Sequence, residues 1–354
     1  MTLATEPIGS VPRPSWLMEA MSGHGSGAVS DEALDQAYDR AVKETVAAME
    51  ETGSPVITDG EQSKPSFATY PIAGLESLAP DGVVIPFADG HTRQLPRLTA
   101  GPFRYTVKSG SFVERAKRFA HKPIKQAVIA PSALSLLYPQ DGLEGYSQEA
   151  FLADLANEAE ADIRSAFEAG AASVQLDFTE GRLSCKLDPS RGLLRQFVAL
   201  NNQVLDRFSD EERARIGIHT CPGGDHNSTH SADVDYAELL PDLFAMNAGS
   251  FFIQLASESD KRRVLGVIAE SRKPDQRVFV GVIDPIDMVV ESADTVRERI
   301  LEAAEFIPAS HLGSTDDCGF SPFGDDVSTA REIAFAKIAA RVEGTDQASR
   351  ALGL

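Results

Sequence analysis

The sequence has 354 residues, of which 42% are hydrophobic and 24% charged, and its formal net charge is −20. This composition is typical of globular proteins, so disordered and fibrous classes are excluded. The acidic excess would repel nucleic acid and anionic membrane surfaces, so we expect neither as a partner and predict a small-molecule substrate.

Short β-rich segments alternate with longer helical segments along the whole chain. About eight candidate strands can be counted, the number that a (β/α)8 TIM barrel requires, so we predict an α/β barrel over residues 1–354 as a single domain. The candidate strands are 6–10, 56–61, 126–131, 173–178, 215–220, 250–256, 278–284 and 311–317. The candidate helices are 31–52, 147–169, 193–208, 236–246, 260–271, 293–306 and 329–342.

The alternation stops after the second candidate strand. Residues from about 81 to 108 predict a β-hairpin insertion, with Asp89-Gly90 as its turn. The insertion mixes basic and aromatic residues in an otherwise acidic chain. It either covers the barrel mouth or meets a neighbouring subunit, which leaves a homo-oligomer open.

The N-terminal residues lack a basic region followed by an apolar stretch, and no apolar run is long enough to span a bilayer. The three cysteines, Cys185, Cys221 and Cys318, are too few and too scattered for a disulfide framework. We therefore expect a cytoplasmic protein with no membrane partner and with reduced thiols. Cys185 lies in the polar stretch 182–186, which is interpreted as a loop, and it is taken as structural or incidental.

A histidine and a cysteine two positions apart end the fifth candidate strand. Side chains two apart point the same way in a strand, so His219 and Cys221 would lie side by side. Cys318 ends the last candidate strand. If these strand ends meet, the three residues form a zinc site that leaves one position free for substrate, as a catalytic zinc requires.

Polar residues recur at the C-terminal ends of the candidate strands, where barrel enzymes place their catalytic groups. Glu61 and Asp177 hold matching positions at two of these ends, which favours a site role over a capping role. His226 and His230 follow Cys221 at a four-residue spacing outside an obvious helix, and a solvated loop is the preferred interpretation.

Two thiolates and an imidazole suit the capture of a substrate thiol. A zinc ion held by such ligands stabilises a thiol as its thiolate at neutral pH, and the sulfur can then attack an electrophilic carbon. A more polar ligand set would suit the activation of water instead.

Five short motifs, in this order, resemble the catalytic barrel of the cobalamin-independent methionine synthase family, which shares a superfamily with uroporphyrinogen decarboxylase. The motifs are Ile8-Gly9-Ser10, Asp59-Gly60-Glu61, Gln175-Leu176-Asp177, His219-Thr220-Cys221 and Asp317-Cys318-Gly319. The resemblance covers essentially the whole chain, although full-length methionine synthases carry a second, N-terminal barrel.

The resemblance implies that His219, Cys221 and Cys318 bind Zn²⁺. It also implies that the backbone of Ile8, Gly9 and Ser10 holds homocysteine, and that Glu61 and Asp177, assigned as the catalytic pair, grip its ammonium group.

The sequence departs from the family's pattern at three places. The family's glutamate ligand belongs on the sixth strand, where Gln254, a poor zinc ligand, is the nearest match. The tryptophan that stacks on folate falls where Leu137 and Tyr138 stand, so Tyr138 is the candidate contact to the second substrate. The histidine after the seventh strand is missing from 284–287.

The leading hypothesis is a zinc-dependent thiol S-alkyltransferase that methylates homocysteine to methionine, with a thiol and an alkyl donor as small-molecule partners. The runner-up keeps the same chemistry with another electrophile, such as an epoxide, as in epoxyalkane:coenzyme M transferase, or a non-folate methyl donor. A third hypothesis is a non-catalytic barrel that binds a small molecule or a protein. A fourth is a metal-free decarboxylase acting through acidic residues and Arg93, Arg97 or Arg104.

Overall fold

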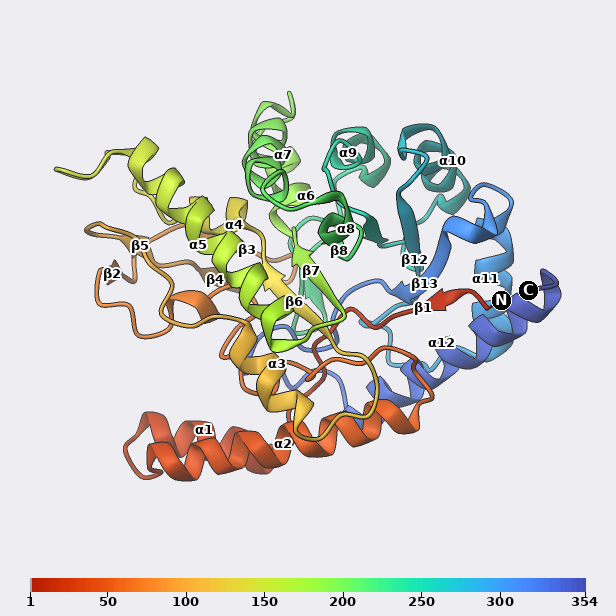
Figure 1. The fold of residues 1–354 in the computed structure, drawn as a ribbon, viewed down its shortest axis with the longest axis horizontal. Coiled ribbons are helices and arrows are strands. Elements are labelled where there is room, and N and C mark those ends of the chain that lie inside the picture. The colour runs from red at the N-terminus through yellow and green to blue at the C-terminus, as the bar shows by residue number, and fades with distance from the viewer. Residues whose placement is uncertain (1) are drawn as a thin grey trace.

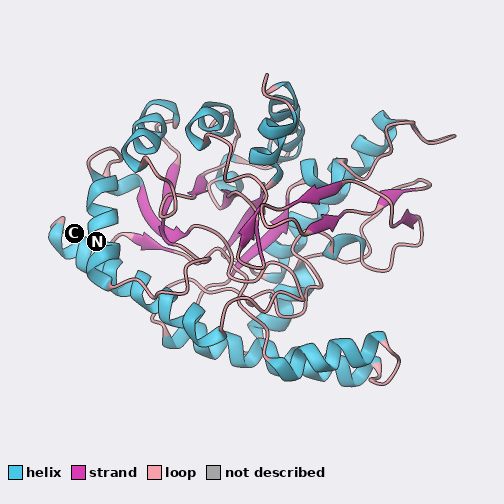
Figure 2. Ribbon diagram, turned by 180° about the vertical axis from the view of Figure 1, so that it is seen from behind, coloured by secondary structure: helices cyan, strands magenta, loops and turns pink. Residues whose placement is uncertain are grey.

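The computed structural model describes residues 2–354 and contains one curled sheet of seven parallel strands. Their order is β1, β13, β12, β11, β8, β7, β6. The strands are β1 (Ala4–Thr5), β6 (Lys125–Ile129), β7 (Ser173–Asp177), β8 (Ile216–Thr220), β11 (Ser250–Ile253), β12 (Arg277–Ile283) and β13 (Leu312–Asp316). Helices surround the sheet (Figures 1 and 2), as in a (β/α)8 barrel, so the predicted fold class is confirmed.

Every residue of β6, β8 and β13 is buried. A parallel strand that is covered on both faces has a nearly continuous run of apolar residues in its sequence. This pattern is why the later strands could be predicted. The helices around them are α2 (Asp31–Glu51), α5 (Gln148–Ala169), α7 (Gly192–Leu205), α9 (Tyr236–Leu243), α10 (Lys261–Ser271), α11 (Ala293–Ala304) and α12 (Arg331–Ala351).

The helix boundaries follow from capping. The Ser147 side chain accepts a hydrogen bond from the backbone N–H of Ala150 at the start of α5. Gly170 ends the same helix with a φ of 99°, a left-handed conformation that glycine adopts without strain. Helix α12 runs to Ala351, beyond the predicted end at residue 342, because it continues to bury small and polar residues such as Thr345 and Ala348.

The first two strands differ from their predictions. Strand β1 ends at Thr5 instead of spanning 6–10, because Pro7 has no N–H to continue the ladder after Glu6 donates to the Ser314 carbonyl. The second strand, predicted at 56–61, is reduced to a single parallel bridge between Ile57 and Ile124. Left-handed φ values of 67° at Gly60 and 58° at Glu61 turn the chain out of the sheet.

The segment after Ile57 nevertheless fills the gap between β6 and the N-terminal chain. The backbone N–H of Lys125 donates to the Ile57 carbonyl at 2.8 Å. On the other side, the Thr58 hydroxyl donates to the Gly9 carbonyl at 2.8 Å, and the Val11 N–H donates to the Gly60 carbonyl at 3.1 Å. Side-chain and irregular backbone hydrogen bonds thus replace part of a strand ladder at this position.

A buried arginine fixes the same region. The Arg13 guanidinium donates to the carbonyls of Glu61 and Lys64, both at 2.6 Å, and to that of Phe323 at 3.1 Å. These three hydrogen bonds hold the irregular second segment against the loop that follows the last strand.

The insertion is built from two short antiparallel pairs. Strands β3 (Val84–Pro86) and β4 (Thr92–Gln94) pair with each other, and β2 (Leu78–Ala79) pairs with β5 (Arg97–Leu98). The backbone N–H of Ala88 donates to the carbonyl of Thr229 at 2.9 Å, in a small hairpin formed by β9 (Gly224–Asp225) and β10 (Ser228–Thr229).

Within the described residues, five further α-helices were not predicted: α1 (Ser15–Gly25), α3 (Gly110–Lys117), α4 (Pro131–Ser135), α6 (Glu180–Leu187) and α8 (Asp210–Arg213). The stretch 182–186, interpreted as a polar loop, therefore lies in α6, and Cys185 packs half-buried against the main core. No helix within residues 2–354 is long and apolar enough to cross a membrane.

Candidate metal centre and substrate cavity

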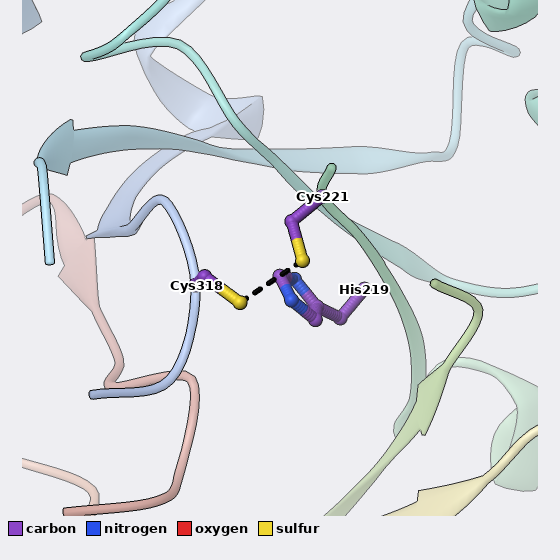
Figure 3. Close-up of side chains that lie close together, drawn as sticks. All are labelled: His219, Cys221 and Cys318. Atoms are coloured by element: carbon purple, nitrogen blue, oxygen red, sulfur yellow. Dashed lines mark hydrogen bonds between the residues drawn. The ribbon is translucent and has the colours of Figure 1, made fainter. Parts of the chain in front are cut away.

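Three soft donors meet where the sheet ends. His219 is the penultimate residue of β8, Cys221 follows that strand, and Cys318 lies two residues beyond β13. The two sulfurs are 2.9 Å apart, and the donor atoms of all three residues lie within 4.8 Å of one another (Figure 3). The structure therefore brings together the three residues that the sequence proposed from two distant strands.

The His219 imidazole is buried, and neither of its ring nitrogens has a hydrogen-bond partner. Burying an unpartnered polar group costs about 1–3 kcal/mol, so this ring is poorly satisfied by the protein alone. A metal ion would complete its bonding, and one nitrogen with two sulfurs is a donor set that zinc prefers. The residues present thus fit a zinc ion.

The two thiols have unlike environments. The hydrogen bond from Cys221, together with the nearby His219 ring, lowers the pKa of Cys318 well below its ordinary value. Burial raises the pKa of Cys221. Cys318 is therefore the thiol that the surrounding protein favours as a thiolate.

The turn after Cys221 requires a glycine. Gly223 has a φ of 70°, and a Cβ at this position would lie 1.8 Å from Nε2 of His230. Its N–H also donates to the sulfur of Cys221 at 3.4 Å. His230, predicted to lie in a solvated loop, is instead buried against this turn, whereas His226 is exposed.

Glu61 and Asp177 both line the cavity beside the three donors. Lys64 donates to the Glu61 carboxylate at 3.1 Å and to the Ala127 carbonyl at 2.8 Å. Burial, with repulsion from Asp177 and Asp59 and against the attraction of Lys64, raises the pKa of Glu61 to about 7. Burial also raises the pKa of Asp177. Two crowded buried carboxyl groups are a suitable receptor for a substrate ammonium group.

Glu180, the first residue of α6, is a cavity residue that sequence reasoning missed. One of its carboxyl oxygens accepts a hydrogen bond from the Ser132 hydroxyl, and the other has no partner. Burial raises the pKa of Glu180 to about 8. The only sequence signal is its place three residues after Asp177, at the end of the same strand.

A cavity of about 510 Å³ opens in front of these groups. Ile8, Gly9 and Ser10 form part of its wall, together with His219 and Cys318. The volume is in the range of small-molecule sites, and most of the lining is apolar with a few polar groups.

Three of the proposed site residues lie outside this wall: Cys221, which is fully buried, Tyr138 and Gln254. The hydroxyl of Tyr138 donates to the Tyr146 carbonyl at 2.7 Å, and its ring stacks on Phe151. The amide oxygen of Gln254 accepts a hydrogen bond from Arg182 at 3.2 Å, and the amide nitrogen donates to Ser257 at 2.7 Å. The side chains of Tyr138 and Gln254 thus make hydrogen bonds to other protein groups.

Fold and site together define a parallel α/β barrel protein with a candidate metal centre at the C-terminal ends of its strands. The family model described as the catalytic domain of cobalamin-independent synthase matches residues 3–340, so the chain belongs to that family of methyltransferases.

Curated relatives and solved structures agree with this assignment. A methionine synthase from Sulfolobus acidocaldarius is 24% identical over 353 residues, covering 97% of this chain and 91% of the relative. One from Sulfurisphaera tokodaii is 23% identical with the same coverage. The B12-independent methionine synthase of Shewanella sp. W3-18-1, solved with selenomethionine, has the same fold, with a TM-score of 0.78 at 18% identity and 99% coverage of both chains.

Proposed function

We propose that the protein is a zinc-dependent thiol S-alkyltransferase and that, in its simplest form, it methylates homocysteine to methionine. The observation that carries this proposal is the buried, unpartnered His219 ring beside two cysteine sulfurs at the wall of a substrate-sized cavity. Membership of the cobalamin-independent synthase family supports it.

His219, Cys221 and Cys318 would hold the zinc ion. When bound, zinc supplies Lewis acidity that lowers the pKa of a substrate thiol, so that its sulfur is nucleophilic at neutral pH. Because His219 and Cys318 line the cavity, a thiol entering it can reach the open side of these donors.

Glu61 and Asp177 orient the amino-acid part of the thiol. An ammonium group placed between them would neutralise their mutual repulsion and restore their ionised forms. Ile8, Gly9 and Ser10 line the same cavity and supply backbone groups for the substrate carboxylate. Holding both substrates in one cavity would provide much of the rate acceleration.

In the transfer step, the substrate sulfur forms a bond to the alkyl carbon of the donor. The bond from that carbon to its leaving group breaks, and its electron pair departs with the leaving group. Glu180 belongs to the cavity wall, and because its pKa is about 8 it is mostly protonated at neutral pH and adds little negative charge there.

The test is zinc content measured together with thiol-dependent product formation. Cys221→Ser and Cys318→Ser should each lose most of the bound zinc and the activity. Cys185→Ser is the matched control, because Cys185 lies in α6 outside the donor group and should retain both. Undiminished activity in a metal-free preparation would contradict the proposal.

A second candidate function keeps the zinc-thiol chemistry but uses another electrophile, such as an epoxide or a non-folate methyl donor. It is favoured by Tyr138, whose ring packs on Phe151 and is absent from the cavity wall where an aromatic contact to folate was expected. Parallel assays of methylfolate and epoxypropane with homocysteine separate the two candidates.

A further inference from the structure

The insertion contacts both stretches of chain that continue from the cysteine donors. We call them the Cys221 segment, residues 222–230, and the Cys318 segment, residues 319–328. In the turn of the insertion, the backbone N–H of Asp89 donates to the Ser228 hydroxyl of the Cys221 segment at 3.2 Å. The insertion thus packs directly on the polypeptide around the candidate metal centre.

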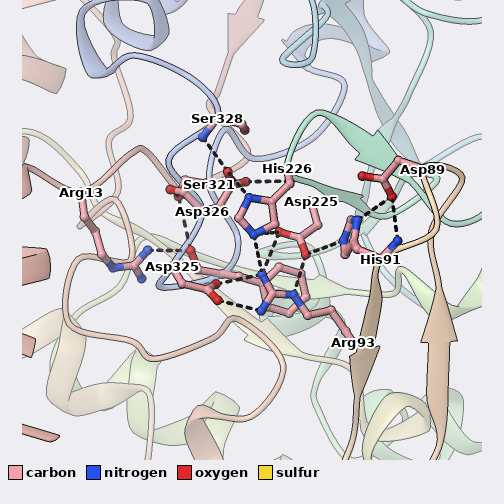
Figure 4. Close-up of polar contacts among 11 residues, drawn as sticks. Arg13, Asp89, His91, Arg93, Asp225, His226, Ser321, Asp325, Asp326 and Ser328 are labelled. Carbon is pink, nitrogen blue, oxygen red and sulfur yellow. Dashed lines mark hydrogen bonds and ion pairs between the residues drawn. The ribbon is translucent and has the colours of Figure 1, made fainter. Parts of the chain in front are cut away.

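Arg93, on β4 of the insertion, binds a carboxylate from each segment (Figure 4). Its guanidinium donates to Asp225 of the Cys221 segment at 2.5 and 3.1 Å, and to Asp325 of the Cys318 segment at 2.8 and 2.9 Å. It also lies 4.3 Å from the centre of the Phe323 ring. Two hydrogen bonds to each carboxylate constrain its direction as well as its distance, so the arginine fixes the two segments relative to each other.

His91 supports the same attachment from a second side. One of its ring nitrogens lies 3.0 Å from the Asp225 carboxylate, and the other lies 2.6 Å from that of Asp89. The Asp225 side chain has no exposed surface, whereas that of Asp325 is 63% exposed. Burying a carboxylate is costly unless it is paired, so the insertion provides the partners that Asp225 needs at this position.

The backbone that precedes Asp225 lies beside both sulfurs. The N–H of Gly223 donates to the Cys221 sulfur at 3.4 Å, and a Cβ at Gly224 would lie 4.0 Å from the Cys318 sulfur. Because Asp225 is the next residue, a shift of its carboxylate would displace this backbone. The position of the Asp225 carboxylate is therefore linked to the positions of both sulfurs.

The direct hydrogen bond between the two segments is longer than those made by Arg93 to Asp325. The backbone N–H of His226 donates to the Asp326 carboxylate at 3.3 Å. The Cys318 segment is also tied to the N-terminal chain, where the Ser10 hydroxyl accepts the N–H of Ser321 at 3.2 Å. Hydrogen bonds between two charged groups are stronger than those between neutral groups, so Arg93 is the stronger link between the segments.

We propose that Arg93 is a positioning residue for the metal centre, because it fixes the separation of the two segments that bring Cys221 and Cys318 together. The insertion is then part of the support of the metal site as well as a wall of the cavity, which Ile85 and Phe87 line. The inference rests on the metal-binding part of the proposed function, since it concerns the residues assigned to zinc.

The first test needs no metal and measures how closely the two sulfurs are held together. Diamide oxidises two thiols to a disulfide: the S–S bond forms, and the two electrons and two protons reduce diamide to its hydrazine. In the metal-free protein carrying Cys185→Ser, the parent protein of this test, mass spectrometry follows the Cys221–Cys318 disulfide. We expect Arg93→Met to slow its formation at least about fivefold, because the sulfurs must be adjacent and aligned to react. An equal or faster rate would overturn the inference.

Arg97→Met is the matched control. Arg97 belongs to the same insertion and donates two hydrogen bonds of 3.0 Å to Asp81, but it does not line the cavity, and its replacement should leave the disulfide rate unchanged. An effect as large as that of Arg93→Met would show a general loosening of the insertion and overturn the inference.

Asp325→Ala covers the case in which Arg93→Met does not fold. It removes an exposed carboxylate and leaves the buried Asp225 paired with Arg93. We expect it to slow disulfide formation by about twofold or more, because one of the two paired contacts is lost. The parental rate in Asp325→Ala would contradict the inference.

The second test measures the geometry of the bound metal. Cobalt(II) replaces zinc in the parent protein, and its visible absorption bands depend on the arrangement of its ligands. Fully loaded Arg93→Met should show shifted bands, and competition with a chelator should show zinc binding about 10–100-fold weaker than in the parent. A loss of fold stability alone would not move the bands of the loaded protein, so unshifted bands would overturn the inference.

The two tests separate this inference from the proposed function. If the parent protein binds no zinc, the proposed function fails and the inference fails with it. Zinc binding by the parent, combined with an unchanged disulfide rate in Arg93→Met, overturns the inference alone.

Discussion

His219 is the residue that most clearly indicates a metal site, because neither nitrogen of its buried ring has a hydrogen-bond partner in the protein. We expect His219→Leu to raise the free energy of unfolding of the metal-free protein by about 1 kcal/mol, since an unsatisfied buried polar group is replaced by an apolar one. Zinc should stabilise the original protein and leave this variant unaffected. Urea unfolding with and without zinc measures both effects, and a variant that zinc still stabilises would contradict the assignment.

Glu180 gives the protein a pH-dependent stability. Its pKa is about 8 in the folded state, above the ordinary value of 4.5, so the folded state holds its proton more tightly than the unfolded state does. The stabilisation it contributes is complete below about pH 4.5 and is lost as the pH rises through about 8.

Glu180→Gln removes this titration. We expect the variant to be more stable than the original protein by about 5 kcal/mol at pH 9 and nearly equal to it at pH 4.5. Thermal or urea unfolding over this range provides the measurement. Parallel stability curves for the two proteins would show that Glu180 is ionised in the folded state at neutral pH.

The grouping of His219, Cys221 and Cys318 could be predicted from the sequence, and the burial of Glu180 could not. His219 and Cys221 share a face because alternation in a strand is a local property, and barrel topology brings Cys318 to the same edge. Glu180 is the first residue of α6, a helix of eight residues that the sequence did not predict, and it is buried there. His230 was misjudged for the same reason: its burial depends on a glycine turn packing against it.

At the scale of elements, Arg13 compensates for the strand that does not form. Its three hydrogen bonds to the carbonyls of Glu61, Lys64 and Phe323 hold the irregular second segment in place. We expect Arg13→Met to lower the free energy of unfolding by about 3 kcal/mol, because buried carbonyls lose their donor.

Arg262→Met is the control for that change. Arg262 pairs with Glu305 at the surface, and an exposed ion pair contributes about 0–1 kcal/mol. Denaturant unfolding of the two variants gives the comparison. An equal loss in both would mean that the Arg13 contacts add nothing beyond a surface interaction.

The later strands were predictable as elements, and the first two were not. Strands β6, β7, β8, β11, β12 and β13 lie within or close to their predicted ranges because burial on both faces leaves a continuous apolar run. The end of β1 at Thr5 depends on its pairing with β13, which Pro7 cannot continue because it has no backbone N–H. The turn at Gly60 depends on the packing of this residue against Val11. Such contacts between distant segments leave no local pattern.

For the whole molecule, the net charge of −20 creates repulsion that salt can screen. We expect the Tm to rise by a few degrees when NaCl increases from about 10 to about 200 mM, because the Debye length falls from about 30 Å to less than 10 Å. Scanning calorimetry measures this shift. An unchanged or lower Tm would show that screened ion pairs outweigh the general repulsion.

The overall architecture was predictable because the number and order of apolar segments limit the possible topologies. The role of the insertion was not. Its position depends on contacts of Arg93 and His91 with Asp225 and Asp325, more than 100 residues further along the chain. Neither spacing nor composition relates these residues before the chain has folded.

The placement of His219 and Cys318 in the cavity wall, with Cys221 fully covered behind them, also limits how an ion could be exchanged. Under the proposed function, a bulky chelator would reach these donors through the same cavity that admits the thiol. If the proposed function holds, homocysteine at saturating concentration should then slow the extraction of zinc by a bulky chelator, because the substrate would occupy that cavity.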